Sequence, residues 1–326
     1  MAPRYLLTLA LGLALVACTD SSDLPPPAPP EPQPSLTYSA EVRRTEYGIP
    51  HIKADDWGSL GYGFGYAYAQ DNFCVAMREI VFATGRSAEL MGEDLGSVES
   101  DFLFRFLNGD KEAFAEEFVS ALPQFARDLA EGYTRGMNRY LEETGVDRLP
   151  EGDLGCRNAE WVAAFDSVDL FLFLRREALR GSSEQGIFRR AILATTGPDN
   201  GAGNAAPASL EQDAAALSAA AATLRDLDRG SNGLALGRDA TRDGSGMLLG
   251  NPHQPWFGAG AWYQAHLTLP GTYDVAGAAL HGFPFIGIGF NRDVAWTHTV
   301  SLANRFSLYE LKLNPDNPLQ YAYDGE

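Results

Sequence analysis

The segment Gly230-Ser231-Asn232 combines residue types that can carry out an unusual peptide-bond reaction. Glycine adopts backbone angles that other residues avoid, so the Gly230 carbonyl could turn towards the Ser231 hydroxyl. Attack by that hydroxyl would convert the amide into an ester, and hydrolysis would free Ser231 as a new N-terminus. Its α-amino group, with an ordinary pKa of about 7.7–8.0, could then act as base for its own hydroxyl. Gly-Ser-Asn is also a common loop tripeptide, so the surroundings must decide.

The sequence changes character on either side of this segment. Residues 207–230 are rich in alanine and carry scattered charges, so a helix there would have little apolar face to bury. Such a stretch suits either a solvent-side linker or a spacer that is cut out. From Ser231 onward, short apolar runs alternate with turn residues, which is typical of β-strands. We expect strands over residues 234–237, 247–250, 262–269, 273–280, 286–290, 294–299 and 306–313.

The half of the chain before the spacer has mainly helical periodicity. Residues 38–53 indicate two short strands around a Gly/Pro turn. Helices are then expected over residues 57–91, 111–144 and 159–180. Gly61, Gly63 and Gly65 suit close packing at the start of the first helix. A helical half followed by a strand-rich half predicts an α+β fold.

The composition limits the possible partners. The chain has 326 residues, 45% of them hydrophobic, which is enough for a large core and one or two domains. Its formal net charge is −18, which argues against a nucleic-acid partner or an anionic membrane surface.

The N-terminus has the features of an export signal. Residues 1–17 combine a basic residue with an apolar run too short for a comfortable membrane span, as in a signal peptide. The run ends Leu15-Val16-Ala17-Cys18, so we expect Cys18 to be lipidated, although an ordinary cleavage site before a cysteine remains the alternative. Residues 18–36 are proline-rich and predict a stiff tether. These features predict a periplasmic protein that reaches the membrane only through its N-terminal lipid.

Two further cysteines, Cys74 and Cys156, remain. Thiols of an exported protein can form a disulfide, and the alternative is a pair of buried free thiols.

Five short motifs carry a resemblance to a known family. They are residues 44–52 (RTEYGIPHI), 61–72 (GYGFGYAYAQDN), 230–232 (GSN), 251–256 (NPHQPW) and 295–300 (AWTHTV). Their order and spacing resemble the penicillin acylase family of N-terminal nucleophile hydrolases over residues 37–326. Within that family, the chain looks most similar to the acyl-homoserine-lactone and aculeacin acylases.

The resemblance implies an αββα sandwich and a precursor that is cut on both sides of a spacer. Residues 37–206 would form the α-chain, residues 207–230 the spacer, and residues 231–326 the start of the β-chain, so the mature protein would be a heterodimer of its own chains. The upstream cut would fall between Gly197 and Ser209. Because the chain ends at Glu326 in a turn-rich stretch, we expect the sequence to be a C-terminally truncated fragment.

The resemblance also assigns roles to individual residues. Ser231 matches the nucleophile and Gly230 the residue left behind by the cut. His253 matches a position beside the nucleophile, the alternative being an imidazole packed in a turn. Val300 matches the residue whose backbone N–H forms half of the oxyanion hole, while the asparagine that supplies the other half has no counterpart here.

The expected function is hydrolysis of N-acyl amides, with N-acyl-homoserine lactones or related lipopeptides as small-molecule substrates. A penicillin or cephalosporin side-chain acylase and a non-catalytic lipoprotein of the same fold are the alternatives. Leu280, Phe283 and Phe285 are candidates for lining an acyl pocket. We expect no cofactor and no metal, because the other histidines lack ligand spacing and Ala303 and Phe306 stand near positions where some relatives bind calcium through acidic residues.

Overall fold

The computed structural model describes residues 37–151, 155–182, 230–258, 260–300, 309 and 311–324. The expected signal peptide, the lipidated Cys18 and the tether lie outside these residues, as do residues 207–229 of the spacer, its upstream cut, and Ala303 and Phe306. The described residues combine helices and strands, which confirms the α+β class. None of the helices in this part of the chain is long and apolar enough to cross a membrane.

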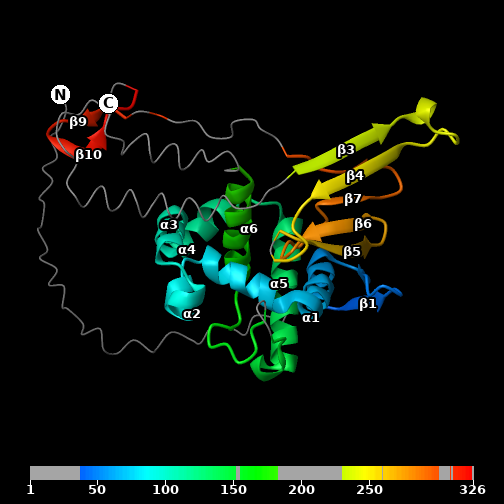
Figure 1. The fold of residues 1–326 in the computed structure, drawn as a ribbon, viewed down its shortest axis with the longest axis horizontal. Coiled ribbons are helices and arrows are strands. Elements are labelled where there is room, and N and C mark those ends of the chain that lie inside the picture. The colour runs from blue at the N-terminus through cyan, green and yellow to red at the C-terminus, as the bar shows by residue number, and fades with distance from the viewer. Residues whose placement is uncertain are drawn as a thin grey trace, which may run out of the picture. The chain divides into compact units, whose positions relative to one another are not determined.

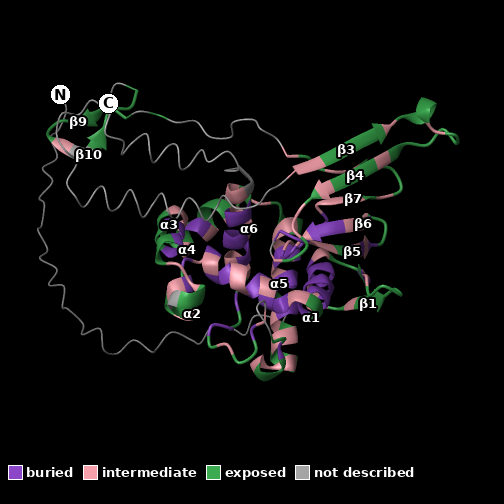
Figure 2. Cartoon of the chain, viewed as in Figure 1, coloured by how far each residue is buried: buried purple, intermediate pink, exposed green. Residues whose placement is uncertain are grey.

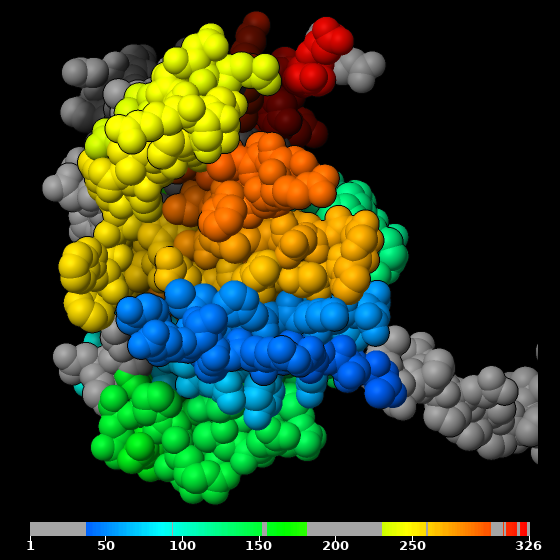
Figure 3. Space-filling view, turned by 90° about the vertical axis from the view of Figure 1, so that its right-hand side faces the viewer, coloured from blue at the N-terminus to red at the C-terminus, as the bar shows by residue number. Residues whose placement is uncertain are grey.

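The described residues form a six-stranded sheet that draws on both halves of the sequence (Figure 1). Its strands are β1 (Ala40–Arg44), β2 (Pro50–Ala54), β5 (Trp262–Leu269), β6 (Tyr273–Leu280), β7 (Ile288–Phe290) and β8 (Ala295–Trp296), in the order β1-β2-β5-β6-β7-β8. The β2–β5 pair is parallel and the other pairs are antiparallel. In Figure 3 the blue surface of β1 and β2 adjoins the orange surface of the later strands. The sheet therefore joins the N-terminal strands directly to the strand-rich half.

Six α-helices are described in the first half of the chain. They are α1 (Trp57–Ala83), α2 (Ser87–Leu95), α3 (Val98–Asn108), α4 (Lys111–Phe114), α5 (Gln124–Thr144) and α6 (Ser167–Ser182). Helix α1 contacts β1, β2 and β5 of the sheet and also packs on α5 and α6. Ile52, Leu267 and Val275 on the sheet join the buried core with α1, which appears purple in Figure 2.

Glycines allow α1 and α5 to pack at very short range. A Cβ atom at Gly61 would collide with the backbone of Leu129, and one at Gly65 with the backbone of Tyr133. On the facing helix, a Cβ atom at Gly136 would collide with the backbone of Tyr62. The expectation that the early glycines of the first helix serve close packing is confirmed.

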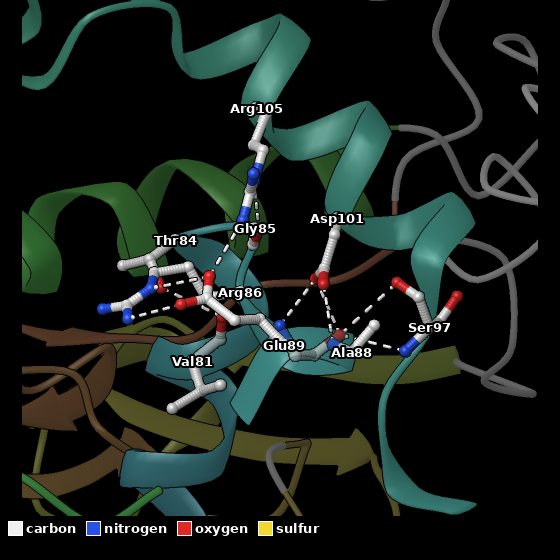
Figure 4. Close-up of polar contacts among 10 residues, drawn as sticks. Val81, Thr84, Gly85, Arg86, Ala88, Glu89, Ser97, Asp101 and Arg105 are labelled. Carbon is white, nitrogen blue, oxygen red and sulfur yellow. Dashed lines mark hydrogen bonds and ion pairs between the residues drawn. The ribbon is translucent and has the colours of Figure 1, made fainter. Parts of the chain in front are cut away.

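The expected single helix over residues 57–91 is wrong, because the chain turns at Gly85 and starts a new helix at Ser87 (Figure 4). Gly85 has a φ of +66°, which an α-helix cannot continue through. The buried Asp101 carboxylate on α3 accepts hydrogen bonds from the backbone N–H groups of Ser87 and Ala88, at 2.7 Å each. These donors are free at a helix start, so a distant residue caps α2. Helix α3 itself was not predicted.

Two other helix predictions also need correction. The stretch 111–144 is divided by Pro123, which has no N–H to continue a helix; α4 and a π-helical turn (Ala115–Val119) precede it and α5 follows. The helix expected over residues 159–180 begins only at Ser167, because Asp166 and Asp169 exchange backbone-to-carboxylate hydrogen bonds of 3.0 and 3.2 Å at its start. This reciprocal capping is a local signal that the periodicity argument overlooked.

The strand predictions are accurate in the middle of the second half and less so at its ends. Strands β5 and β6 have the predicted bounds. The strands expected over 286–290 and 294–299 are shorter, as β7 and β8. Residues 306–308 and 310 lie outside the described residues, and the next strand is β9 (Leu313–Asn314), which pairs with β10 (Asn317–Tyr321).

A disulfide joins Cys74 on α1 to Cys156, which follows α5, with their Cα atoms 5.4 Å apart. The two residues are 82 positions apart in sequence. Closing a loop of this length restricts the unfolded chain and is worth about 2–5 kcal/mol in small exported domains.

A buried histidine predicts a pH-dependent stability. His281 is 8% exposed, its Nδ1 lies 3.0 Å from the Tyr68 hydroxyl, and burial lowers its pKa to about 4. Since the unfolded state binds this proton near pH 6.5, stability should rise with pH between about 4 and 6.5. His281→Gln keeps an acceptor but cannot titrate. We therefore expect the free energy of unfolding, measured by urea titration, to change less between pH 8 and pH 5 in this variant than in the wild type. The two changes should differ by about 2 kcal/mol.

His298 is exposed, so His298→Gln is the matched control for the same change of residue outside the core. An equal pH dependence in His281→Gln and the wild type would contradict the assignment.

Candidate active site

The expected nucleophile lies on a two-stranded ribbon. Strands β3 (Gly230–Leu236) and β4 (Met247–His253) pair antiparallel along their whole length. Both are longer than predicted from residues 234–237 and 247–250, and the extensions contain Ser231 and His253. In the register, Ser231 is opposite Pro252 and Gly230 is opposite His253. Pairing therefore places the expected nucleophile and the expected site histidine at the same end of the ribbon.

Ser231 is also in contact with the expected oxyanion residue. The Val300 backbone N–H donates a hydrogen bond of 3.0 Å to Ser231 Oγ, and both residues are half-buried. They are separated by 69 positions in sequence. The fold thus aims a backbone donor at the serine oxygen.

His253 is held by two asparagines on the other face of the ribbon. The side-chain amide nitrogens of Asn232 and Asn251, which are cross-strand partners, lie 3.2 and 3.3 Å from His253 Nε2. The sequence motifs contain both asparagines, but no role was predicted for them. The available signal was their spacing, because Asn232 is two residues from Gly230 and Asn251 is two residues from His253, which places them on one face of the strands.

Gly230 lies against His253. Its φ does not lie in the left-handed region. A Cβ atom at Gly230 would lie 2.8 Å from His253 Nδ1. The absence of a side chain lets the Nδ1 edge of the imidazole lie directly against the residue that precedes Ser231.

The candidate acyl-pocket residues lie at the boundary of sheet and helix. Phe283 packs against Phe173 of α6 with ring centroids 5.7 Å apart, and against Phe285 at 5.4 Å. Leu280 ends β6 opposite Trp262, and Phe285 is exposed. Within the described residues, no hydrogen bond or ring contact joins this group to Ser231, so its role stays a prediction.

Most other histidines have partners of their own. His51 Nδ1 lies 2.9 Å from His266 Nδ1, and His266 Nε2 lies 2.7 Å from Asp274 Oδ1, which lowers the pKa of that carboxyl. Within the described ranges, no three His, Cys, Asp or Glu side chains come together in a way that could hold a metal ion.

The first two sequence motifs meet in the fold away from Ser231. Arg44 donates a hydrogen bond of 2.8 Å to Asp71, and the Tyr263 hydroxyl donates one of 2.7 Å to the same carboxylate. These residues come from β1, α1 and β5, so they tie the sheet to its helix.

A model of one family, described as penicillin amidase, matches residues 39–326 of this chain. The chain belongs to the penicillin amidase family. The resemblance that the five motifs indicated is therefore confirmed. Members of this family process into α- and β-chains and act on small acyl-amide substrates.

Named members of the penicillin amidase family align with almost the whole chain. An acyl-homoserine lactone acylase, PvdQ, of Pseudomonas fluorescens (strain Pf0-1) is 43% identical over 301 residues, covering 90% of this chain and 37% of the relative. The aculeacin-A acylase of Actinoplanes utahensis is 39% identical over 339 residues, covering 100% of this chain and 41% of the relative. The chain therefore spans about two fifths of the length of these relatives.

Among solved structures, a thermostable penicillin G acylase from Alcaligenes faecalis aligns with 53% of this chain and 98% of its own, at 24% identity and a TM-score of 0.39.

Proposed function

We propose that the chain carries the nucleophile of an N-terminal serine amidohydrolase that cuts its own Gly230–Ser231 bond and then hydrolyses N-acyl amides. The observation that carries this proposal is the 3.0 Å hydrogen bond from the Val300 N–H to Ser231 Oγ at the start of β3. Family membership supports the reaction class, and the ribbon supplies the residues for it.

The first reaction is the self-cleavage. Ser231 Oγ attacks the Gly230 carbonyl carbon, a C–O bond forms, the C–N bond breaks, and the hydroxyl proton passes to the Ser231 nitrogen. Water then hydrolyses the ester, which leaves a Gly230 carboxylate and a free Ser231 amine. The Val300 N–H positions Oγ for this attack, and the Nδ1 edge of His253 lies against Gly230.

The second reaction uses the freed amine as base. It takes the proton of its own hydroxyl while Oγ attacks the substrate carbonyl and a C–O bond forms. The amide C–N bond then breaks, the Ser231 ammonium gives the proton to the leaving nitrogen, and an acyl-enzyme remains. Water then releases the acid. The Val300 N–H donates to Oγ in the uncut chain. During hydrolysis it would turn from Oγ to the carbonyl oxygen of the substrate, where one such donor is typically worth about 10²–10³ in rate.

The substrate class follows from the relatives. Both named acylases are called after amides with acyl chains, an acyl-homoserine lactone and aculeacin A. We therefore propose long-chain N-acyl amides as substrates. The test measures the intact mass of the full-length protein and then release of acid from long-chain acyl-homoserine lactones, phenylacetyl amides and glutaryl amides. One uncut chain without hydrolysis would overturn the proposal, and preference for phenylacetyl amides would overturn the substrate class.

Gly230→Ala tests the role of the contact with His253. The new methyl would lie 2.8 Å from Nδ1 and would push the imidazole out of its place, so we expect self-cleavage to slow at least tenfold. The measurement is the fraction of cut chain against time by mass spectrometry. Gly237→Ala is the control, because a methyl added there would meet no atom within 4 Å. Gly244→Ala is unsuitable, because Gly244 has a φ of +72° and a side chain there would be strained. Equal cleavage rates for Gly230→Ala and Gly237→Ala would show that the contact is unimportant.

A further inference from the structure

We propose that Gly233 and Gly250 are positioning residues for the Val300 N–H. Because they lack side chains, Thr297 can pack against the ribbon, and this packing fixes the position of Val300. This inference rests on the proposed function, because it explains how the donor reaches Ser231. Neither glycine contacts Ser231 Oγ or the expected substrate carbonyl, so both act through the segment 297–300.

The two glycines lie directly opposite each other in the β3–β4 register. Since side chains alternate along a strand, this pair lies on the same face as Ser231 and Pro252, one step further along the ribbon. A side chain at either position would therefore project into the space beside the nucleophile. The paired glycines leave a notch in this face.

Thr297 occupies the notch. A Cβ atom at Gly250 would lie 2.9 Å from Thr297 Oγ1 and 3.1 Å from Thr297 Cβ. A Cβ atom at Gly233 would lie 3.2 Å from Thr297 Cγ2 and 3.6 Å from Thr299 Cγ2. Real Cβ atoms almost never approach other atoms to within 3.0 Å, so a methyl at Gly250 would force Thr297 away from the ribbon.

The segment that carries Thr297 is fixed at both ends. Just before it, β8 pairs with β7, and the Trp296 indole N–H donates a hydrogen bond of 2.8 Å to the Gly287 carbonyl. Three residues after it, the Val300 N–H reaches Ser231 Oγ. Because Trp296 is held, the residues before Thr297 cannot shift with it. We therefore infer that a displacement of Thr297 moves Val300.

Neither glycine is explained by backbone conformation. Both lie inside strands and neither has a φ in the left-handed region. Glycine in a strand interior weakens the strand and often marks a close backbone approach. Here the close approach is that of Thr297, whose buried Oγ1 finds no hydrogen-bond partner among the described residues. Among the described residues, packing against the two glycines is what holds this side chain.

The test compares Gly250→Ala with Gly237→Ala in the full-length protein. Gly237 lies just after the same ribbon, and a methyl added there would meet nothing within 4 Å, so the control makes the same chemical change without a contact. We expect Gly250→Ala to slow self-cleavage and to lower kcat for the acyl amide about 10- to 100-fold with KM little changed, because only the donor to the reacting oxygen moves. Gly237→Ala should match the wild type in both.

A rescue experiment distinguishes positioning from a general loss of structure. Thr297→Ser removes Cγ2, the atom that a methyl at Gly233 would meet, but leaves Oγ1 and Cβ, which a methyl at Gly250 would meet. Thr297→Ser should therefore restore the rates of Gly233→Ala and fail to restore those of Gly250→Ala. Rescue of both variants or of neither would overturn the proposal.

Amide hydrogen exchange at Val300 gives a readout that does not depend on activity. We expect it to be at least tenfold faster in Gly250→Ala than in Gly237→Ala, with equal exchange in the helices. If the wild type neither cuts nor hydrolyses but this difference appears, the proposed function fails while the positioning role stands. Equal Val300 exchange in the two variants would overturn the positioning role even in an active enzyme.

Discussion

Replacing Ser231 by alanine is expected to leave the full-length chain uncut and to abolish amide hydrolysis. No hydroxyl then remains to attack Gly230 or a substrate, and removing the nucleophile of a serine hydrolase costs about 10⁶ in kcat. Ser231→Cys should still cut, because a thiol can perform the same acyl shift. The measurements are intact mass after purification and release of acid from a long-chain acyl-homoserine lactone.

A matched control is available on the same ribbon. Ser245 lies in the loop between β3 and β4, is exposed, and donates its hydroxyl hydrogen bond to Asp243. Ser245→Ala should cut and hydrolyse at the wild-type rate. Maturation of Ser231→Ala into two chains would mean that another group, or another protein, performs the cut.

The largest effect on stability is expected at a buried cluster of charges between α1 and α6. Arg176 and Glu177 are 8% and 7% exposed. Glu177 accepts hydrogen bonds from Arg176 at 3.1 Å and from Arg180 at 2.8 Å, and Arg176 also pairs with Glu79 of α1. Removing the Glu177 carboxylate takes a partner from both guanidiniums, and removing one member of a buried ion pair typically costs about 3–5 kcal/mol.

Glu177→Gln has nearly the same shape and should lower the free energy of unfolding by about 3 kcal/mol, measured by urea titration. Glu142→Gln is the control, since Glu142 pairs with Arg139 on the exposed surface of α5, where solvent screens the interaction and the loss should be small. Similar losses in the two variants would show that burial adds little to the Glu177 cluster.

The sequence predicts best those elements whose signal is local. Strand β5 alternates between buried and more exposed positions, and the turn residues Pro270-Gly271 separate it from β6, so the bounds of both strands are visible in a short window and are predicted correctly. The helix expected over residues 57–91 ends before Gly85, whose φ of +66° is typical of a helix-ending glycine and is not visible in hydrophobic periodicity. The new start at Ser87 depends on Asp101, a residue from another helix, and this tertiary cap leaves no trace in the local sequence.

The same distinction applies to the candidate site. Ser231, His253 and Val300 were predicted because a family resemblance supplies long-range information that periodicity lacks. Asn232 and the Gly233–Gly250 pair were not, since their parts depend on which residues of β3 and β4 face each other. A shift of one residue in that register would bring Ser231 to the face of His253. Register is settled by the fold as a whole.

The parallel pairing of β2 with β5 has a consequence for the protein after the proposed cut at Gly230. Residues 51–53 are paired with residues 266–268 through the backbone, and α1 fills the core beneath both strands. The two products would thus share one sheet and one interior. Their separation would require global unfolding, so the mature heterodimer should not exchange subunits at equilibrium, and dilution should not dissociate it. Two pieces produced separately would have to fold around each other, because neither one alone contains a complete sheet.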